Sequence, residues 1–196
     1  MTGPPEIVEN WTLLDGSAAT LRPIRASDME LERAFVRNLS PQSKFKRFMG
    51  ELKELSPEQL HAFTHPDHDR ESVYVVIRSS VAGEEEIAVA RYMVVEPEAK
   101  SCEFAITIAD AWQGKGVAGR LMRTLIGDAR ARGLETMHGY VLGANTRMLD
   151  FVRKLGFRIE FDRDDPAVRI ARLDLQAAPA REGRGGPGAG DGAGKG

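Results

Sequence analysis

A glycine-rich segment has the clearest capacity for chemistry in this sequence. Residues 113–121 read QGKGVAGRL and lead into a helical pattern with Val117, Leu121, Leu125 and Ala129 on one stripe. Glycines at the start of a helix expose backbone N–H groups that lack a helical partner, and the helix dipole adds partial positive charge there. The segment predicts a site for a phosphate or diphosphate. A glycine turn without a ligand is the alternative, which the segment alone leaves open.

Two common nucleotide-binding patterns do not fit this segment. Gly114, Gly116 and Gly119 satisfy the spacing G-x-G-x-x-G. A dinucleotide-binding fold, however, needs these glycines directly after its first strand and an acidic residue about 20 positions later, and the sequence has neither feature. A phosphate-binding NTPase loop needs Ser or Thr after its lysine, whereas Lys115 is followed by glycine.

The segment and its surroundings match a third pattern. Residues 113–118 follow Q/R-x-x-G-x-G/A, with a strand before them and a long helix and a strand after them. Asn145 then precedes a helix that ends in KLGF at residues 154–157. In these features the chain resembles the GNAT (Gcn5-related) N-acetyltransferases over residues 21–175. The resemblance implies an α/β (α+β) GNAT fold, with a mixed, mostly antiparallel sheet of about seven strands flanked by helices and a splayed strand pair at the acetyl-CoA site.

Three further segments narrow the resemblance. Residues 40–48 (SPQSKFKRF), 67–71 (DHDRE) and 102–106 (CEFAI) are similar to the acetyltransferase domain of bacterial protein lysine acetyltransferases that modify acyl-CoA synthetases. This similarity implies acetyl-CoA as the acyl-donor substrate, direct transfer in a ternary complex, and a protein lysine as the acceptor. An acceptor that is a small amine, such as a polyamine, amino acid or drug, is the alternative. A non-catalytic module that senses acetyl-CoA is a third interpretation.

The resemblance also implies which residues bind the substrate. The predicted set is Ile106, Thr107, Ile108, Gln113, Gly114, Lys115, Gly116, Val117, Ala118, Gly119, Arg120 and Asn145. The resemblance also implies that the strand around Ile106 bonds the pantetheine arm of acetyl-CoA through its backbone and places an N–H group near the oxyanion. Asn145 is equally suited to cap the next helix, and Lys115 and Arg120 can instead be solvated charges. Many family members have a tyrosine as general acid where this chain has Val152, so we assign no general acid.

Glu103 is the candidate general base. Alternation along the strand places Glu103, Ala105 and Thr107 on one face, and Cys102 and Phe104 on the other. A lysine amine with a pKa near 10.4 must lose a proton before it attacks a thioester, and a carboxylate can accept that proton directly or through water. The resemblance places the base at Glu103. Without it, a solvent-facing glutamate is the simpler interpretation.

A group of histidines and aspartates has spacing that could suit a metal. Its members are His61, His65, Asp67, His68 and Asp69. Pro66 ends the helix that carries the first two, so His65 and His68 cannot share its face. We therefore predict no metal site.

The rest of the sequence predicts the helices and strands that position these residues. Ser27 with Glu30, and the pairs Ser40-Pro41 and Ser56-Pro57, predict three helix starts, near residues 28–38, 41–49 and 57–63. Two more helices are expected, one before Gly133 and one from residue 145 to Gly156. Strands are expected near residues 20–24, 72–79, 86–95, 101–108, 136–142, 157–161 and 168–173.

Composition limits the possible partners and the location. The formal net charge is −2, which argues against general binding to nucleic acid or membranes. One cysteine, Cys102, fits a reducing compartment, and we expect a cytoplasmic protein with no export signal. We expect an N-terminal segment at residues 1–19, one domain at residues 20–175, and a flexible tail rich in Gly and Ala at residues 176–196.

Overall fold

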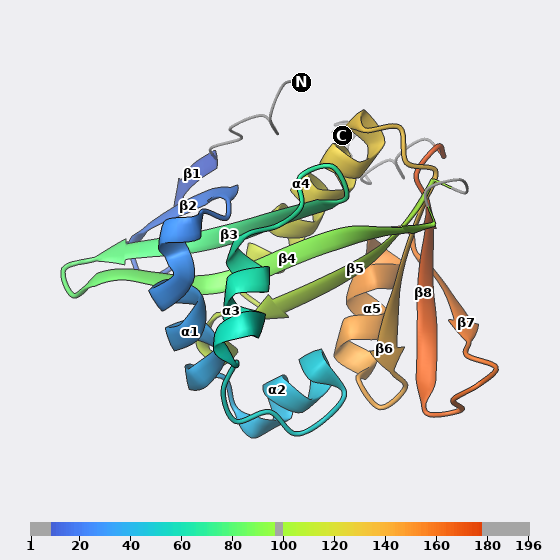
Figure 1. Ribbon diagram of the computed structural model, residues 1–196, viewed down its shortest axis with the longest axis horizontal. Coiled ribbons are helices and arrows are strands. Elements are labelled where there is room, and N and C mark those ends of the chain that lie inside the picture. The colour runs from blue at the N-terminus through green and yellow to red at the C-terminus, as the bar shows by residue number, and fades with distance from the viewer. Residues whose placement is uncertain (1–8, 97–99, 178–196) are drawn as a thin grey trace, which may run out of the picture.

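The fold is an eight-stranded sheet with helices on both faces (Figure 1). The computed structural model describes residues 9–96 and 100–177. The strands, in the order β1-β2-β3-β4-β5-β6-β8-β7, are β1 (Glu9–Thr12), β2 (Ala18–Pro23), β3 (Glu71–Ser80), β4 (Gly83–Glu96), β5 (Ser101–Ile108), β6 (Thr136–Leu142), β8 (Val168–Asp174) and β7 (Arg158–Phe161). The helices are α1 (Met29–Asn38), α2 (Pro41–Phe48), α3 (Pro57–Thr64), α4 (Val117–Ala131) and α5 (Thr146–Lys154).

The predicted α/β class, the five helices and seven of the strands are confirmed. The eighth strand, β1, lies within the segment at residues 1–19 and pairs with β2. Sequence reasoning missed it because its four residues, ENWT, are too few to show a period. The predicted tail lies outside the described residues from residue 178 onward. In the described part of the chain, every helix is too short or too polar to cross a membrane.

The serine caps were predicted correctly for two helices and wrongly for one. Ser40 and Ser56 each accept a hydrogen bond from the backbone N–H three residues later, at 3.2 Å, and begin α2 and α3. The predicted cap at Ser27 is wrong, because residues 26–28 form a short 3₁₀ turn and Asp28 takes the cap position of α1. The Asp28 carboxylate instead accepts two hydrogen bonds from buried Arg22, at 2.6 and 2.8 Å.

The sheet separates two layers of side chains. Tyr74 and Val76 of β3 face the large core that α4 and α5 cover. Val73, Val75 and Ile77, which alternate with them, pack with Ile24 and Leu31 near α1 on the other face. Continuous burial in the middle of β3 follows, because both faces of this strand are covered.

The parallel pair β5–β6 separates after three residues. The paired positions are Ser101 with Thr136, Cys102 with Met137, and Glu103 with His138. Beyond them the two strands diverge, as Figure 1 shows. Phe104 lies where the gap begins, and a Cβ atom on Gly139 would be 2.6 Å from its ring. The predicted splay is therefore present. Because Gly139 has no side chain, the Phe104 ring fits where the two strands begin to separate.

A buried carboxylate joins α4 to the sheet. Asp128 accepts hydrogen bonds from Ser72 Oγ at 2.7 Å, Tyr74 Oη at 3.1 Å and Tyr92 Oη at 2.5 Å. Arg132 Nε lies 3.3 Å from the same carboxylate. Burial and the neighbouring negative charge raise the pKa values of both tyrosines above their ordinary value, so the phenols stay donors. This arrangement fixes the long helix against β3 and β4.

We expect Asp128→Ala to lower the free energy of unfolding by about 3 kcal/mol, because three buried hydroxyl groups lose their acceptor. In a domain of this size that loss lowers the melting temperature by roughly 6–12 °C. Urea unfolding of the full chain measures the change. Tyr74→Phe is the matched control and removes one of these bonds, which costs about 1 kcal/mol. Equal losses in the two variants would contradict a central role for the carboxylate.

Candidate active site

The predicted anion-binding turn lies between β5 and α4. A 3₁₀ turn, η2 (Asp110–Trp112), leads into it, and Gly116 is the N-cap of α4. Gly114 and Gly116 have φ angles of 78° and 85°, where a side chain costs about 1–2 kcal/mol. Among the described residues no side chain caps this end of the 15-residue helix. Its first N–H groups therefore remain available to an anionic group.

Gln113 ties the turn to three other elements. Its Nε2 donates to the carbonyl oxygen of Ile108 at 3.2 Å and to Ser43 Oγ of α2 at 3.3 Å. Its Oε1 accepts a hydrogen bond from Arg147 of α5 at 3.3 Å. Arg147 also covers Gly114, where a Cβ atom would lie 2.5 Å from the guanidinium. Sequence reasoning missed Arg147, because it lies 34 positions after Gln113 in the chain.

Two predicted cations of this site lie against aromatic rings. Lys115 Nζ is 4.7 Å from the centre of the Trp112 ring. The guanidinium of Arg120 lies 5.0 Å from the Trp11 ring and forms an ion pair with Glu9. Arg120 therefore holds β1 against the start of α4, a structural role that the sequence did not suggest.

The first turn of α4 can meet a ligand through its backbone. The Val117 side chain is buried in the core, and Ala118 is half-buried. The Cβ position of Gly119 is 3.5 Å from the guanidinium of Arg123, a second basic residue that sequence reasoning missed. The small residues thus leave the peptide groups accessible, with positive charge nearby.

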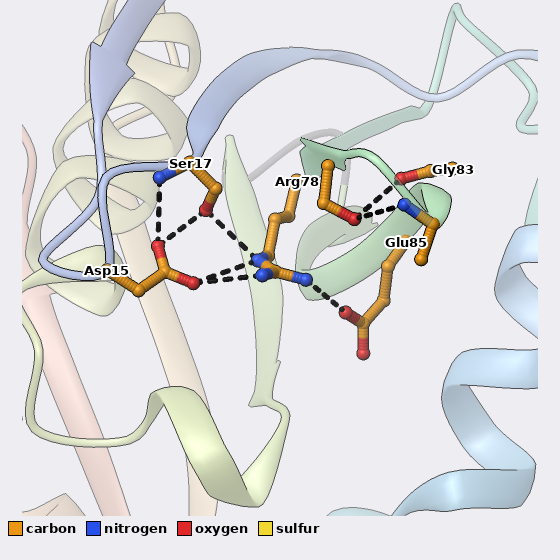
Figure 2. Close-up of polar contacts among 7 residues, drawn as sticks. Asp15, Ser17, Arg78, Gly83 and Glu85 are labelled. Atoms are coloured by element: carbon orange, nitrogen blue, oxygen red, sulfur yellow. Dashed lines mark hydrogen bonds and ion pairs between the residues drawn. The ribbon is translucent and has the colours of Figure 1, made fainter.

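Arg78 of β3 joins the turn between β1 and β2 to the start of β4 (Figure 2). It donates to Asp15 at 2.9 Å and to Ser17 at 3.0 Å, and it pairs with Glu85 at 3.4 Å. Hydrogen bonds from Ser17 hold the pKa of the Asp15 carboxyl at about 2. Because Arg78 also lies 5.6 Å from the centre of the Trp112 ring, these turns support the residue that precedes the glycine segment.

Beyond Glu103, the edge of β5 that faces β6 has backbone groups that are not paired with that strand. Ala109 N–H bonds to Ile87 of β4, whereas the carbonyl of Ile108 faces the other way and is taken by Gln113. Backbone groups alternate in direction along a strand, so those of Ile106 also point into the gap. The side chains of Ile106 and Ile108 pack on the core, and that of Thr107 is buried on the opposite face. These three residues directly precede the turn, and their contact with a substrate stays a prediction.

Glu103 is half-buried on the face that α1, α2 and α3 cover, at the last position where β5 and β6 pair. Its neighbours across the strands are Met93 of β4 and His138 of β6. His138 is nearly buried, and its Nδ1 lies 3.4 Å from Ser101 Oγ. Sequence reasoning missed His138, whose proximity depends on the strand register.

The histidines and aspartates of residues 61–69 are not arranged around a common point that could hold a metal ion. The rings of His61 and His65 stack 3.9 Å apart at the end of α3. In the described ranges no group of three or more His, Cys, Asp or Glu residues is placed to hold a metal ion. Cys102 is buried as predicted, and burial raises the pKa of its thiol to about 12.

Comparisons with known proteins decide the family. The model of the acetyltransferase (GNAT) domain family matches residues 19–158. The chain belongs to the GNAT acetyltransferase family. An acetyltransferase of Pseudomonas aeruginosa is 37% identical over 85% of this chain and 90% of its own length. The acetyltransferase Pat of Mycolicibacterium smegmatis is 27% identical over 79% of this chain, which spans 45% of that relative.

Solved structures agree with this assignment. The GNAT domain of S. lividans PAT has a TM-score of 0.77 and 29% identity, and the match covers 88% of this chain and 99% of that domain. An N-acetyltransferase from Staphylococcus aureus, at 18% identity and a TM-score of 0.61, shares the fold over 81% of this chain and 99% of its own.

Helix α5 of this GNAT domain has a capping residue at its start and no phenol at position 152. Asn145 Oδ1 accepts a hydrogen bond from the N–H of Met148 at 3.4 Å, so the capping interpretation of Asn145 is confirmed. Its contact with a substrate stays a prediction. Val152 is fully buried in the main core, which leaves the position of the usual tyrosine inside the domain.

A pair of buried carboxyl groups lies under α1, on the Glu103 face of the GNAT domain. Glu32 of α1 and Glu86 of β4 are each 2% exposed. Both oxygens of Glu86 and one of Glu32 meet no donor among the described residues. Burial raises both pKa values, that of Glu86 strongly, with the Glu32 charge as a second cause. These raised pKa values favour a proton held between the two carboxyl groups.

We expect Glu86→Gln to stabilise the protein at pH 8 and to have a smaller effect at pH 5. The folded state keeps a proton that the unfolded chain releases above its ordinary pKa of 4.5, so wild-type stability falls as the pH rises from there towards the raised pKa. The amide needs no such proton. Melting temperatures across this pH range measure the difference.

Glu84→Gln is the matched control, because Glu84 is exposed two residues away. It should keep the wild-type pH profile. A Glu86→Gln variant with the wild-type slope would rule out the shared proton.

Proposed function

We propose that this domain transfers the acetyl group of acetyl-CoA to a lysine side chain of another protein, with acyl-CoA synthetases as the candidate acceptors, in a ternary complex. The main support is the uncapped N-terminus of α4 behind its glycine turn, next to a strand edge with free backbone groups. The similarity of residues 40–48, 67–71 and 102–106 to bacterial protein lysine acetyltransferases favours a protein acceptor. We also infer a cytoplasmic location, in keeping with one buried cysteine.

The reaction starts with the loss of a proton from the acceptor amine. Glu103 accepts this proton directly or through one water. It is half-buried and lies at the last paired position of β5 and β6, where the two strands begin to separate. Arg47 of α2 is close enough to feel the Glu103 charge.

The neutral amine then attacks the thioester carbonyl carbon. The new C–N bond places negative charge on the carbonyl oxygen, and the N–H of Ile106 or Ile108 donates to it. As the carbonyl re-forms, the C–S bond breaks, and the nitrogen, which became positively charged when the C–N bond formed, loses its second proton to water. The thiolate takes up a proton from water. This last step needs no protein acid, since a thiol with a pKa near 8.5 is a good leaving group.

Mass spectrometry of acceptors incubated with the protein and acetyl-CoA tests this function. An acetylated lysine on an acyl-CoA synthetase or another protein supports the proposal. Acetylation of amino acids or polyamines alone would favour a small-amine enzyme. Binding of acetyl-CoA without any product would favour a sensor.

We expect Glu103→Gln to lower kcat by about 10²–10⁴-fold, with the affinity for acetyl-CoA nearly unchanged, because the amide cannot accept the proton. The residual rate should rise with pH up to about pH 10, where the amine deprotonates unaided. Steady-state kinetics and calorimetry give the two values. Glu160→Gln on β7, an exposed strand position, is the control. A wild-type kcat in Glu103→Gln would contradict the role of Glu103 as the general base.

We expect Gly116→Ala to weaken the binding of coenzyme A by about 5–30-fold, since a left-handed alanine costs about 1–2 kcal/mol and the turn must rearrange to avoid it. Calorimetry with coenzyme A measures the loss. Gly127→Ala is the matched control, because its Cβ atom meets no atom within 4 Å and it lies inside the same helix. That change should keep the affinity and stabilise the fold by up to about 1 kcal/mol. Unchanged affinity in Gly116→Ala would contradict diphosphate binding at this turn.

A further inference from the structure

One arginine reaches the glycine turn from the far side of the gap between β5 and β6. β5 ends at Ile108 and leads to the turn, whereas β6 ends at Leu142 and leads to α5, which carries Arg147. The two strands are parallel, so their ends lie at the same edge of the sheet. The hydrogen bond from Arg147 to Gln113 therefore spans the open end of the gap.

The guanidinium of Arg147 lacks a negatively charged partner. Within the described part of the chain it forms no ion pair, and its one hydrogen bond, to the amide oxygen of Gln113, is 3.3 Å long. The carboxylate of α5, that of Asp150, pairs with Arg153 at 2.8 Å. Holding an exposed arginine in one place costs side-chain entropy, and one long bond to a neutral amide returns little of it. The contact with Gln113 alone therefore does not explain the position of this side chain.

The surroundings of the Arg147 guanidinium are also positive. Among the residues that the structure describes, the N–H groups of Gly114, Lys115 and Gly116 donate no hydrogen bond, and the first turn of α4 contains no acidic residue. Partial positive charge at a helix N-terminus repels a cation. An anion that binds both the guanidinium and the turn replaces this repulsion with two attractions.

The diphosphate of CoA fits this arrangement. GNAT domains use acetyl-CoA as a substrate, and its diphosphate has the negative charge and the acceptor oxygens that these donors lack. Because Gly114 has no side chain, the guanidinium can lie against the backbone of the turn, where a Cβ atom would be 2.5 Å from it. A guanidinium can donate two parallel hydrogen bonds to phosphate oxygens. Arg147 thus lies where it can add side-chain donors to the backbone donors of the turn.

We propose that Arg147 binds the diphosphate of CoA from α5, opposite the glycine turn. This inference rests on the proposed function, because it concerns the acyl donor of the same reaction. The bound diphosphate then joins the segments that follow β5 and β6, at the edge where the two strands no longer bond to each other. Arg147 holds CoA in place while its pantetheine arm occupies the gap.

Calorimetry with CoA tests this contact without turnover. We expect Arg147→Gln to weaken the affinity of the full chain at least about tenfold, because the amide carries no charge to pair with the diphosphate. Arg147→Lys keeps the charge but loses the paired hydrogen bonds, so its affinity should be intermediate. Arg153→Gln removes the same charge from an exposed position of the same helix and should bind CoA as the wild type does. All three variants should melt as the wild type does without ligand, because both arginines are exposed.

A second acyl donor distinguishes direct contact from an effect through Gln113. S-Acetylpantetheine has the thioester and the arm of acetyl-CoA but no phosphate. We expect Arg147→Gln to lower kcat/KM at least about tenfold with acetyl-CoA and less than about twofold with S-acetylpantetheine. A role limited to orienting Gln113 and the strand edge would lower both values by the same factor.

The outcomes separate this proposal from the proposed function. Wild-type affinity for CoA in Arg147→Gln, or equal losses with the two acyl donors, would overturn the role of Arg147 alone. Binding of CoA that depends on Arg147, with no acetylated product, would support that role and refute the proposed function. No binding of CoA to the wild type would refute both.

Discussion

The separation of β5 from β6 after Glu103 is the constraint on which the site depends. A parallel pair that stops after three residues leaves backbone groups of the following residues without strand partners, which is costly unless another group bonds them. Gln113 satisfies one such group, the carbonyl of Ile108, and thereby fixes the glycine turn to the open strand edge. One amide side chain thus couples the gap in the sheet to the start of α4.

The two faces of the sheet differ in the side chains that pack against them. On one face α4 and α5 pack on a large apolar core, and Asp128 holds α4 through the hydroxyl groups of β3 and β4. A rigid α4 keeps its N-terminus at a constant position relative to the gap. The other face, under α1–α3, contains the buried carboxyl groups of Glu32 and Glu86, with Arg47 nearby. Buried carboxyl groups of this kind lower stability when both are ionised, which favours a shared proton.

Much of the fold could be predicted from local signals. The serine-proline starts of α2 and α3, the stripe of α4 and the alternation of β5 depend on neighbours within a few residues, and each was confirmed. The failures were short or context-dependent. β1 has four residues and no period, and Asp28 takes the cap position of α1 while its carboxylate binds Arg22 of β2.

The sequence by itself determined the order of the elements and the glycine turn, because these follow from periodicity and from residue types at fixed spacing. The family and the candidate base Glu103 came from the resemblance of these motifs to the GNAT acetyltransferases, and alternation added only the face of the strand on which Glu103 lies. The tertiary structure decided which residues surround the site. Arg147 over Gly114, His138 beside Glu103, and Arg47 with Thr107 in one pocket each join segments that are distant in the chain. Strand register and helix packing alone determine such contacts, and neither leaves a local pattern in the sequence.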